Sequence, residues 1–207
     1  GGCTERMGSV AAGTTVSDYK PEEIKRHSSV CTATGSIQLD GLKVNLLDTP
    51  GMFDFAGGMI QGISAADCVM ITVSGKSGVR VGTKKAYRAA AGKPRMFVVT
   101  KLDDENANFY NVLTDLKSTF GPSVCPVVVP VIVDRKVDSY INLIEMKAYR
   151  YDADGKAQEI PLPTSEVSEK LSYRVDGLIQ AFSEAIAETD ETLFEKFFSG
   201  EEFTQKE

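Results

Sequence analysis

"LLDTPGMFDF" at residues 46–55 combines an acid, a proline and a glycine directly after an apolar run. Open α/β sheets bind ligands where their strands end, and a carboxylate such as Asp48 can hold a magnesium ion there through water. Gly51 would let a backbone N–H approach a terminal phosphate without an intervening side chain. A strand-ending aspartate followed by an ordinary proline turn would also explain the pattern.

"TKLD" at residues 100–103 follows a second apolar run. A carboxylate at Asp103 can accept both hydrogens from N1 and N2 of guanine, which adenine cannot supply, and the stem of Lys101 can lie along the flat base. The alternative is a solvated helix start in which Asp103 or Asp104 is the N-cap. The two patterns follow one another in the order of a nucleotide site, with one strand–helix unit between them. Together they predict GTP binding in the protein to which these residues belong.

The elements that would position both patterns alternate along the chain. Residues 1–29 are polar and read as a long loop, and a hairpin is expected around Asp40-Gly41. Apolar runs at 68–75 and 95–103 predict buried parallel strands, since such strands are apolar on both faces. Helices are expected between and after them, at 57–68, 82–92 and 105–121. The alternation of strand and helix predicts parallel βαβ units.

The alternation of strands and helices ends at about residue 122. Three segments read as one strand each, namely 124–133, 139–152 and 156–163, with Asp154-Gly155 turning a hairpin. Acidic helices are expected at 165–188 and 190–200. We therefore predict a division into 1–121, a partial GTP-binding core, and 122–207, a second layer or inserted subdomain.

Composition limits the class of protein. The 207 residues allow one sizeable domain, or a domain with a smaller appendage. The 23 basic against 29 acidic residues leave no overall basic field for nucleic acid or a membrane. The scattered Cys3, Cys31, Cys68 and Cys125 form no C-x-x-C pair, which favours reduced thiols in a cytosolic protein. The longest apolar run, residues 127–133, is too short to span a bilayer. Because the chain opens at Gly1 in mid-pattern, we expect an excised piece of a longer protein.

Along nearly its whole length the sequence resembles the G domain of bacterial elongation factor G and its paralogues. The stretches that carry the resemblance are "GTTVSDYKPEE", "NLLDTPGMFDF", "SGVRVGTKKAYR", "TKLDDENANFY" and "LIEMKAYRYD". It implies an α/β fold, namely an incomplete P-loop-NTPase-like G domain with a mostly parallel sheet, plus an α+β insertion subdomain. The implied cofactors are GTP and magnesium, and the implied GTP-binding residues are Asp48, Thr49, Pro50, Gly51, Met52, Thr100, Lys101, Leu102 and Asp103.

Several positions depart from the family pattern. The phosphate-binding loop G-x-x-x-x-G-K-[ST] is absent at that spacing, so the amide cradle and lysine for the β and γ phosphates are missing. Thr100 replaces the usual asparagine of N-K-x-D, and Ser29 stands where switch I offers a threonine hydroxyl to magnesium. Met52 occupies the place of the histidine that orients the attacking water. A thioether cannot take that role, so no catalytic residue is predicted.

The resemblance implies a ribosome-associated translational GTPase in the cytoplasm, with the ribosome and its stalk protein as partners and no membrane attachment. The isolated piece is expected to be inactive and to hold no nucleotide. Two alternatives remain: a factor impaired in hydrolysis that uses GTP as a conformational clamp, or a protein-interaction module in 122–207. With the strand before the phosphate loop missing, we expect its neighbours to pair directly, or the gap to be filled by another segment or a neighbouring chain.

Overall fold

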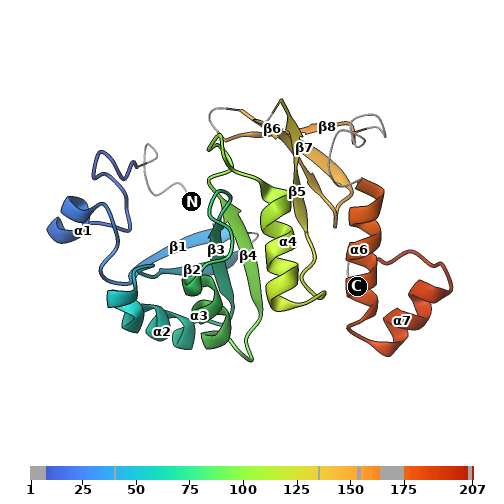
Figure 1. Cartoon of the computed structure of the whole chain (residues 1–207), viewed down its shortest axis with the longest axis horizontal. Helices are drawn as coiled ribbons and strands as arrows, with labels where there is room; N and C mark the ends of the chain where they lie inside the picture. Colours follow the sequence, from blue (N-terminus) through green and yellow to red (C-terminus); the bar gives the residue numbers. More distant parts are fainter. Residues whose placement is uncertain (1–7, 40, 135, 153–154, 164–174, 205–206) are drawn as a thin grey trace. The chain divides into compact units, whose positions relative to one another are not determined.

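The computed structural model of the chain describes residues 8–39, 41–134, 136–152, 155–163, 175–204 and 207 (Figure 1). Its contacts divide the chain into two compact units. The first unit comprises Gly1–Thr72 and Arg80–Val98, and the second comprises Val73–Val79 and Val99–Glu207. None of the described helices combines the length and apolar character that crossing a bilayer would need.

A β-hairpin leads the first unit to the D-T-P-G turn. Strand β1 (Ala33–Leu39) pairs antiparallel with β2 (Leu42–Asp48), so that Ala33 lies opposite Asp48. Gly41 has a φ of 78°, a value that glycine adopts without strain in a tight turn. The predicted hairpin is confirmed, although its Asp40 lies outside the described residues.

The predicted loop over residues 1–29 is wrong near its end, where helix α1 (Pro21–Arg26) forms. Proline suits the first turn of a helix because its missing N–H has no partner there. The Glu23 side chain accepts a hydrogen bond from the Lys20 N–H (3.1 Å), which caps the first turn. His27 ends the helix in a left-handed conformation. Helix α1 forms because its ends are capped locally, and the polar composition of the segment did not reveal these caps.

Three further helical segments belong to the first unit. They are η1 (Phe53–Phe55), α2 (Ala56–Ala65) and α3 (Val81–Ala89), and α2 and α3 confirm the predicted helices within a few residues. Lys93 closes α2: its Nζ donates to the carbonyl oxygens of Ile63, Ser64 and Ala66 at 2.8, 2.8 and 2.6 Å. A lysine at this end satisfies carbonyls that have no partner in the helix and complements the helix dipole.

The predicted βαβ unit is present. Strands β3 (Val69–Ser74) and β4 (Arg95–Thr100) are neighbours in one sheet, with α3 between them in sequence. The N–H of Val69 donates to the Pro94 carbonyl and that of Gly75 to the Thr100 carbonyl, so the two strands advance in the same direction. Burial on both faces was predicted but is not observed. Ile71 and Val73 are buried, whereas the side chain of Met70 between them is 58% exposed.

The strands on either side of the expected gap do not pair directly in the described part of the chain. Strand β2 belongs to the two-stranded sheet β1-β2 and strand β3 to the two-stranded sheet β3-β4. Direct pairing, the first of the predicted compensations, is therefore wrong. Filling of the gap by another segment or a neighbouring chain stays a prediction.

The second unit is built on a four-stranded antiparallel sheet in the order β5-β6-β7-β8. Its strands are β5 (Val128–Val133), β6 (Lys136–Asn142), β7 (Lys147–Tyr151) and β8 (Ala157–Ile160). Its helices are α4 (Phe109–Phe120), α6 (Val175–Ala187) and α7 (Glu191–Phe198). Residues 165–174 of the first predicted acidic helix lie outside the described residues.

The segment 139–152, predicted as one strand, is two strands joined by a turn. The Asn142 side chain accepts hydrogen bonds from the backbone N–H groups of Ile144 and Glu145, at 3.0 and 3.2 Å, which folds the chain back on itself. Met146 then adopts a φ of 54° before β7 begins. Leu143 is buried within this turn, so apolar residues continue from one strand to the next.

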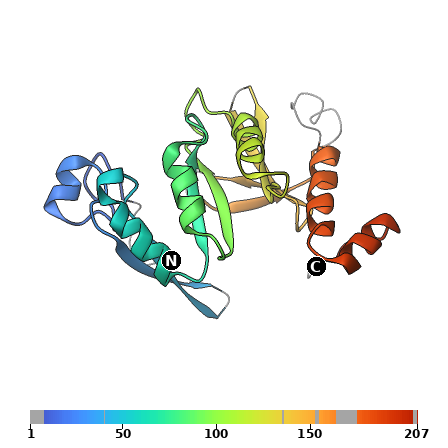
Figure 2. The same ribbon diagram turned by 60° about the horizontal axis from the view of Figure 1, so that its bottom comes forward.

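One apolar cluster joins α4, the sheet and α6. Phe109 and Leu113 of α4 pack with Val129 and Ile141 of the sheet and with Leu178 of α6. Figures 1 and 2 show both helices beside this sheet. The hydroxyl of Tyr110 donates to the Pro130 carbonyl inside the core (2.8 Å), and burial raises the pKa of Tyr110 to about 12. The predicted apolar face of the helix at 105–121 is thus confirmed as core.

Candidate functional site

The T-K-L-D motif lies where strand β4 ends. Thr100 is the last residue of the strand, and Lys101 follows it with a φ of 57°. A left-handed conformation is uncommon for a residue with a side chain and costs on the order of 1 kcal/mol. Lys101 is exposed, so the turn presents its long side chain at the carboxyl edge of the sheet, where open α/β sheets bind ligands.

Gly75 holds this turn in place from the neighbouring strand. Its N–H donates to the Thr100 carbonyl (2.8 Å), and its own carbonyl accepts from the N–H of Asn108 (3.0 Å). A Cβ at position 75 would lie 2.8 Å from a methyl carbon of Leu102, closer than such atoms approach. Gly75 was not among the residues that the sequence motifs singled out. Its position at the end of a predicted parallel strand could have identified it. The carboxyl ends of neighbouring parallel strands lie at the same edge of a sheet, so Gly75 would be expected near the T-K-L-D motif.

The structure distinguishes the adjacent Asp103 and Asp104. The Asp104 carboxylate accepts from the N–H of Asn106 (2.9 Å) and pairs with Lys76 Nζ (3.3 Å). The Asn106 amide, first of all, and Lys76 hold the pKa of Asp104 below its ordinary value. Helix α4 begins only at Phe109 and is capped by the side chain of Asn108. The alternative in which Asp103 or Asp104 caps the helix is therefore wrong.

Asp103 itself is exposed, and no described residue donates a hydrogen bond to its carboxylate. It lines an open pocket of about 640 Å³ together with the other residues of the motif and with Val99. The opposite wall consists of side chains from strands β6 and β7, which the sequence analysis did not connect with the motif: Lys136, Val137, Asp138, Tyr140 and Tyr151. A free carboxylate in a concave site is the arrangement that recognition of a guanine edge requires.

The D-T-P-G turn follows strand β2 in the first unit. Asp48 is exposed at the strand end, and Pro50 is buried. The turn rests on two glycines of α2: a Cβ at Gly62 would lie 2.5 Å from Thr49 Cγ2, and one at Gly58 would lie 3.2 Å from Pro50 Cδ. The glycines that weaken the helix propensity of 57–68 thus allow a close approach. No described atom would contact a Cβ at Gly51, which leaves its backbone open.

Met52 follows the turn with its side chain 48% exposed. It caps the short helix η1 only through its backbone, because its carbonyl accepts from the N–H of Phe55 (3.1 Å). Its thioether is a weak acceptor and has no ionisable proton. The Met52 side chain therefore cannot act as a general base. Its exposed position leaves it accessible to a bound partner.

Ser29 lies in a segment organised by a buried carboxylate. Glu23 is 1% exposed, and its Oε1 accepts from the N–H groups of Val30 and Cys31, both at 3.0 Å. These two amides are the largest cause of a lowered pKa at Glu23. The Ser29 hydroxyl donates to Asp18 Oδ1 (2.7 Å). Among the described residues no group of three or more acidic, histidine or cysteine side chains could hold a metal ion.

The fit of the chain to its implied ligands is therefore uneven. Asp103 and its pocket fit a guanine base. The Asp48 carboxylate is exposed at the end of β2, whereas the Ser29 hydroxyl donates to Asp18 and would first have to leave it to bind a metal ion. The tripeptide Gly75-Lys76-Ser77 resembles the end of a phosphate loop, but Met70 stands where the motif needs glycine and Lys76 pairs with Asp104. The T-K-L-D motif belongs to the second unit and the D-T-P-G turn to the first.

Comparison with known proteins shows the family to which the chain belongs. Residues 2–198 match the elongation factor Tu GTP binding domain, and the chain belongs to that family. It is 37% identical over 198 residues to an elongation factor G-like protein of Mycobacterium tuberculosis (strain ATCC 25618 / H37Rv), covering 95% of this chain and 26% of the relative. An elongation factor G-like protein of Thermotoga maritima is 34% identical over 193 residues, covering 92% of this chain and 27% of the relative.

A crystal structure of a protein from Thermus thermophilus has the same fold, with a TM-score of 0.86 and 41% identity over 98% of this chain and 30% of that one. The predicted α/β G-domain fold and the resemblance to bacterial elongation-factor-G-like proteins are confirmed. The chain is thus a GTP-binding domain of the translation-factor type. It spans about a quarter of the length of the curated relatives it matches.

Proposed function

We propose that this chain is the guanine-recognising part of a ribosome-associated, elongation-factor-G-like GTPase. The observation that carries the proposal is the exposed Asp103 carboxylate, which lines a pocket at the end of β4 while the neighbouring Asp104 is held by Asn106 and Lys76. In this proposal Asp103 accepts the N1 and N2 hydrogens of guanine, and the Lys101 stem lies along the base. Thr100 lacks the amide of the usual asparagine and makes a weaker contact there.

The remaining roles belong to the first unit. Asp48 would hold magnesium through water, and Gly51, with no side chain in the way, would offer its amide to the terminal phosphate. Thr49 and Pro50 would shape the turn, and the Ser29 hydroxyl would complete the metal site after leaving Asp18. We also propose that residues 1–121 are a partial GTP-binding core and 122–207 its insertion subdomain. Ribosome association implies a cytoplasmic location.

A second candidate is a factor that binds GTP as a conformational clamp and hydrolyses it poorly. Met52 favours it, because a thioether at this exposed position cannot orient an attacking water through a strong hydrogen bond. Ribosome-stimulated phosphate release by the full-length protein separates the two candidates. A GTPase releases phosphate in many turnovers, whereas a clamp retains GTP on the ribosome.

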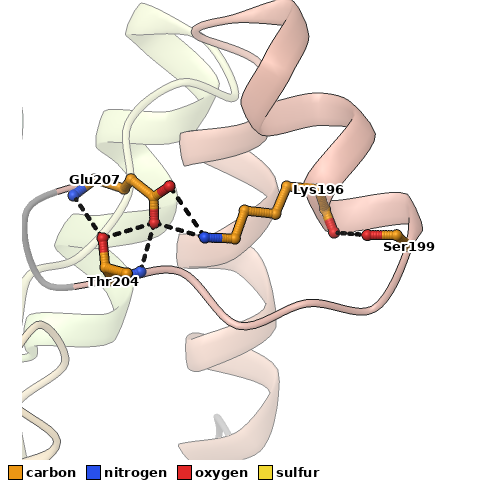
Figure 3. A network of polar contacts seen from close by, with 4 residues as sticks. All are labelled: Lys196, Ser199, Thr204 and Glu207. Atoms are coloured by element: carbon orange, nitrogen blue, oxygen red, sulfur yellow. Dashed lines mark hydrogen bonds and ion pairs between the residues drawn. The ribbon is translucent and has the colours of Figure 1, made fainter.

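A third candidate is a protein-interaction role for residues 122–207. Phe194 and Phe198 of α7 contact each other with ring centroids 4.7 Å apart, yet their side chains are 48% and 72% exposed. The segment after α7 is held by Glu207, which pairs with Lys196 Nζ (2.8 Å) and accepts from the Thr204 hydroxyl (2.7 Å), as Figure 3 shows. The exposed pair Phe194 and Phe198, on a helix whose Lys196 pairs with Glu207, would offer an apolar contact to a partner such as the ribosomal stalk protein. Retention of that protein by residues 122–207 is the test.

The main proposal is tested by base selection. Asp103→Asn in the full-length protein should lower the affinity for GTP and raise that for xanthosine triphosphate, because an amide can donate to the additional oxygen of xanthine. Asp104→Asn is the matched control and should leave the preference between the two nucleotides unchanged. If Asp103→Asn also left that preference unchanged, Asp103 would not read the base.

A further inference from the structure

The pocket beside Asp103 has a second wall that neither motif supplies. Side chains of β6 and β7 form it, and the aromatic ones are Tyr140 and Tyr151. Their rings meet edge to face, with centroids 5.8 Å apart and planes at 76°. The volume of the pocket, about 640 Å³, lies within the usual range of small-molecule sites.

Polar groups of this hairpin fall into two sets. Those away from the pocket are paired: the Tyr149 hydroxyl donates to Glu145 (2.7 Å), and Lys147 Nζ pairs with Glu159 (2.9 Å). In the described part of the chain, the hydroxyls of Tyr140 and Tyr151 and the ammonium of Lys136 make no hydrogen bond or ion pair.

Asp138 is the exception among the pocket-lining groups, because both of its oxygens accept from Arg150 (2.8 and 3.0 Å). The wall therefore offers donors and aromatic surface toward the pocket, and its one carboxylate is already neutralised.

Tyr140 lies within electrostatic reach of the base-reading carboxylate. Burial first, then the neighbouring Tyr151 and the negative charge of Asp103, raise the pKa of Tyr140. Its hydroxyl consequently stays protonated at neutral pH and can donate a hydrogen bond. Tyr151 is 51% exposed and presents ring surface to the solvent at the pocket.

We propose that Tyr140 and Tyr151 contact the nucleoside whose guanine edge is held by Asp103, so that the β6–β7 hairpin determines nucleotide affinity. The inference rests on the proposed guanine-binding function and adds a second wall to that site. Tyr151 packs its ring against the base or ribose, and the Tyr140 hydroxyl donates to an oxygen or nitrogen of the nucleoside. Since aromatic packing accepts any base, this wall strengthens binding while Asp103 alone selects guanine.

The test uses the nucleoside guanosine, which needs no phosphate loop, and the full 207-residue chain labelled with ¹⁵N. Guanosine at millimolar concentration should shift the amide signals of residues 100–103 and also those of 136–140 and 151. Tyr151→Ala should weaken guanosine binding at least about fivefold, the lower end of the usual scale for losing one aromatic contact with a base. Tyr140→Phe should weaken it by a smaller factor. Tyr149→Phe, whose hydroxyl is paired with Glu145, is the matched control and should bind as the unaltered chain does.

Selectivity separates this inference from the proposed function. Tyr151→Ala should weaken the binding of guanosine and of adenosine by the same factor, whereas Asp103→Asn should change the ratio of the two affinities. Shifts confined to residues 100–103, with normal binding by both tyrosine variants, would overturn the inference and leave the guanine site standing. No shift at residues 100–103 up to saturating guanosine would count against both. Should Tyr151→Ala fail to fold, Tyr151→Leu removes the ring but keeps an apolar side chain, and unchanged guanosine binding by both Tyr151→Leu and Tyr140→Phe would overturn the inference.

Discussion

The backbone N–H of Gly75 donates a 2.8 Å hydrogen bond to the carbonyl oxygen of Thr100 and ties the end of β3 to the first residue of the T-K-L-D motif. The same glycine leaves room for the Leu102 side chain. Its carbonyl also accepts from Asn108, the cap of α4. A residue outside the motif therefore fixes the turn from which Asp103 reaches its pocket.

Gly75→Ala should lower the free energy of unfolding by about 1–3 kcal/mol, because overpacking forces neighbouring atoms to move. The added Cβ would meet Leu102 at 2.8 Å and both Ala107 and the Thr100 carbonyl at 3.2 Å. Urea unfolding measures the loss. Gly177→Ala on α6 is the control, because no atom of the described residues lies within 4 Å of the added Cβ; it should be neutral or stabilising by up to about 1 kcal/mol. Equal stability of both variants would show that the approach at Gly75 is not tight.

The D-T-P-G turn should depend on Gly62 in the same manner. Gly62→Ala places a Cβ 2.5 Å from Thr49 Cγ2, and the branched threonine side chain has few rotamers to escape into. We expect a loss of about 1–3 kcal/mol in the free energy of unfolding. The Cβ added by Gly57→Ala in the same helix meets no described atom within 4 Å, so this variant should not destabilise the chain. A destabilising effect of Gly57→Ala would mean that helix α2 itself, and not its contact with the turn, is sensitive.

Glu23 should make the segment around Ser29 sensitive to acid. Its lowered pKa means that the carboxylate stabilises the fold above the ordinary glutamate value of 4.5, and that this contribution is lost as pH falls through the folded-state pKa. Glu23→Gln should cost about 1–3 kcal/mol at neutral pH, since the amides of Val30 and Cys31 lose a charged acceptor.

Thermal unfolding across pH measures both effects, and the carboxyl ¹³C shift of Glu23 reports its pKa directly. Glu22→Gln is the matched control, because Glu22 pairs with Arg26 on the exposed surface and should contribute little. A Glu23 pKa at or above 4.5 would contradict the prediction.

Met52→His should raise ribosome-stimulated GTP hydrolysis by the full-length protein, about tenfold or more, if the missing imidazole limits the rate. Phosphate release measured with excess ribosomes gives the rate. Met52→Leu removes the thioether without adding a hydrogen-bonding group and should leave the rate unchanged. A histidine variant no faster than the leucine variant would indicate that another group positions the water.

Much of the fold follows from local sequence patterns. The hairpin at Gly41, the helices after residues 55 and 80, and the parallel unit from Val69 to Thr100 were predictable, because turn residues and apolar spacing act over a few positions. The exposure of Met70 was not, since burial on the second face of a strand depends on which other segments cover it. Helix α1 was missed because its capping by Glu23 is one specific hydrogen bond within a polar segment.

The sequence by itself placed Asp48 and Asp103 at strand ends and left two roles open for the pair Asp103-Asp104. Only the tertiary structure excluded the helix-capping role, because Asn108 caps α4 and Asp104 lies 3.3 Å from Lys76, which comes from the loop after the neighbouring strand. The contribution of Tyr140 and Tyr151 to the pocket beside Asp103 could not be predicted from the sequence either. The two tyrosines line this pocket only because the β5–β8 sheet folds as it does. Local patterns encode where a strand ends, whereas contacts between distant segments depend on packing that no short stretch of the chain contains.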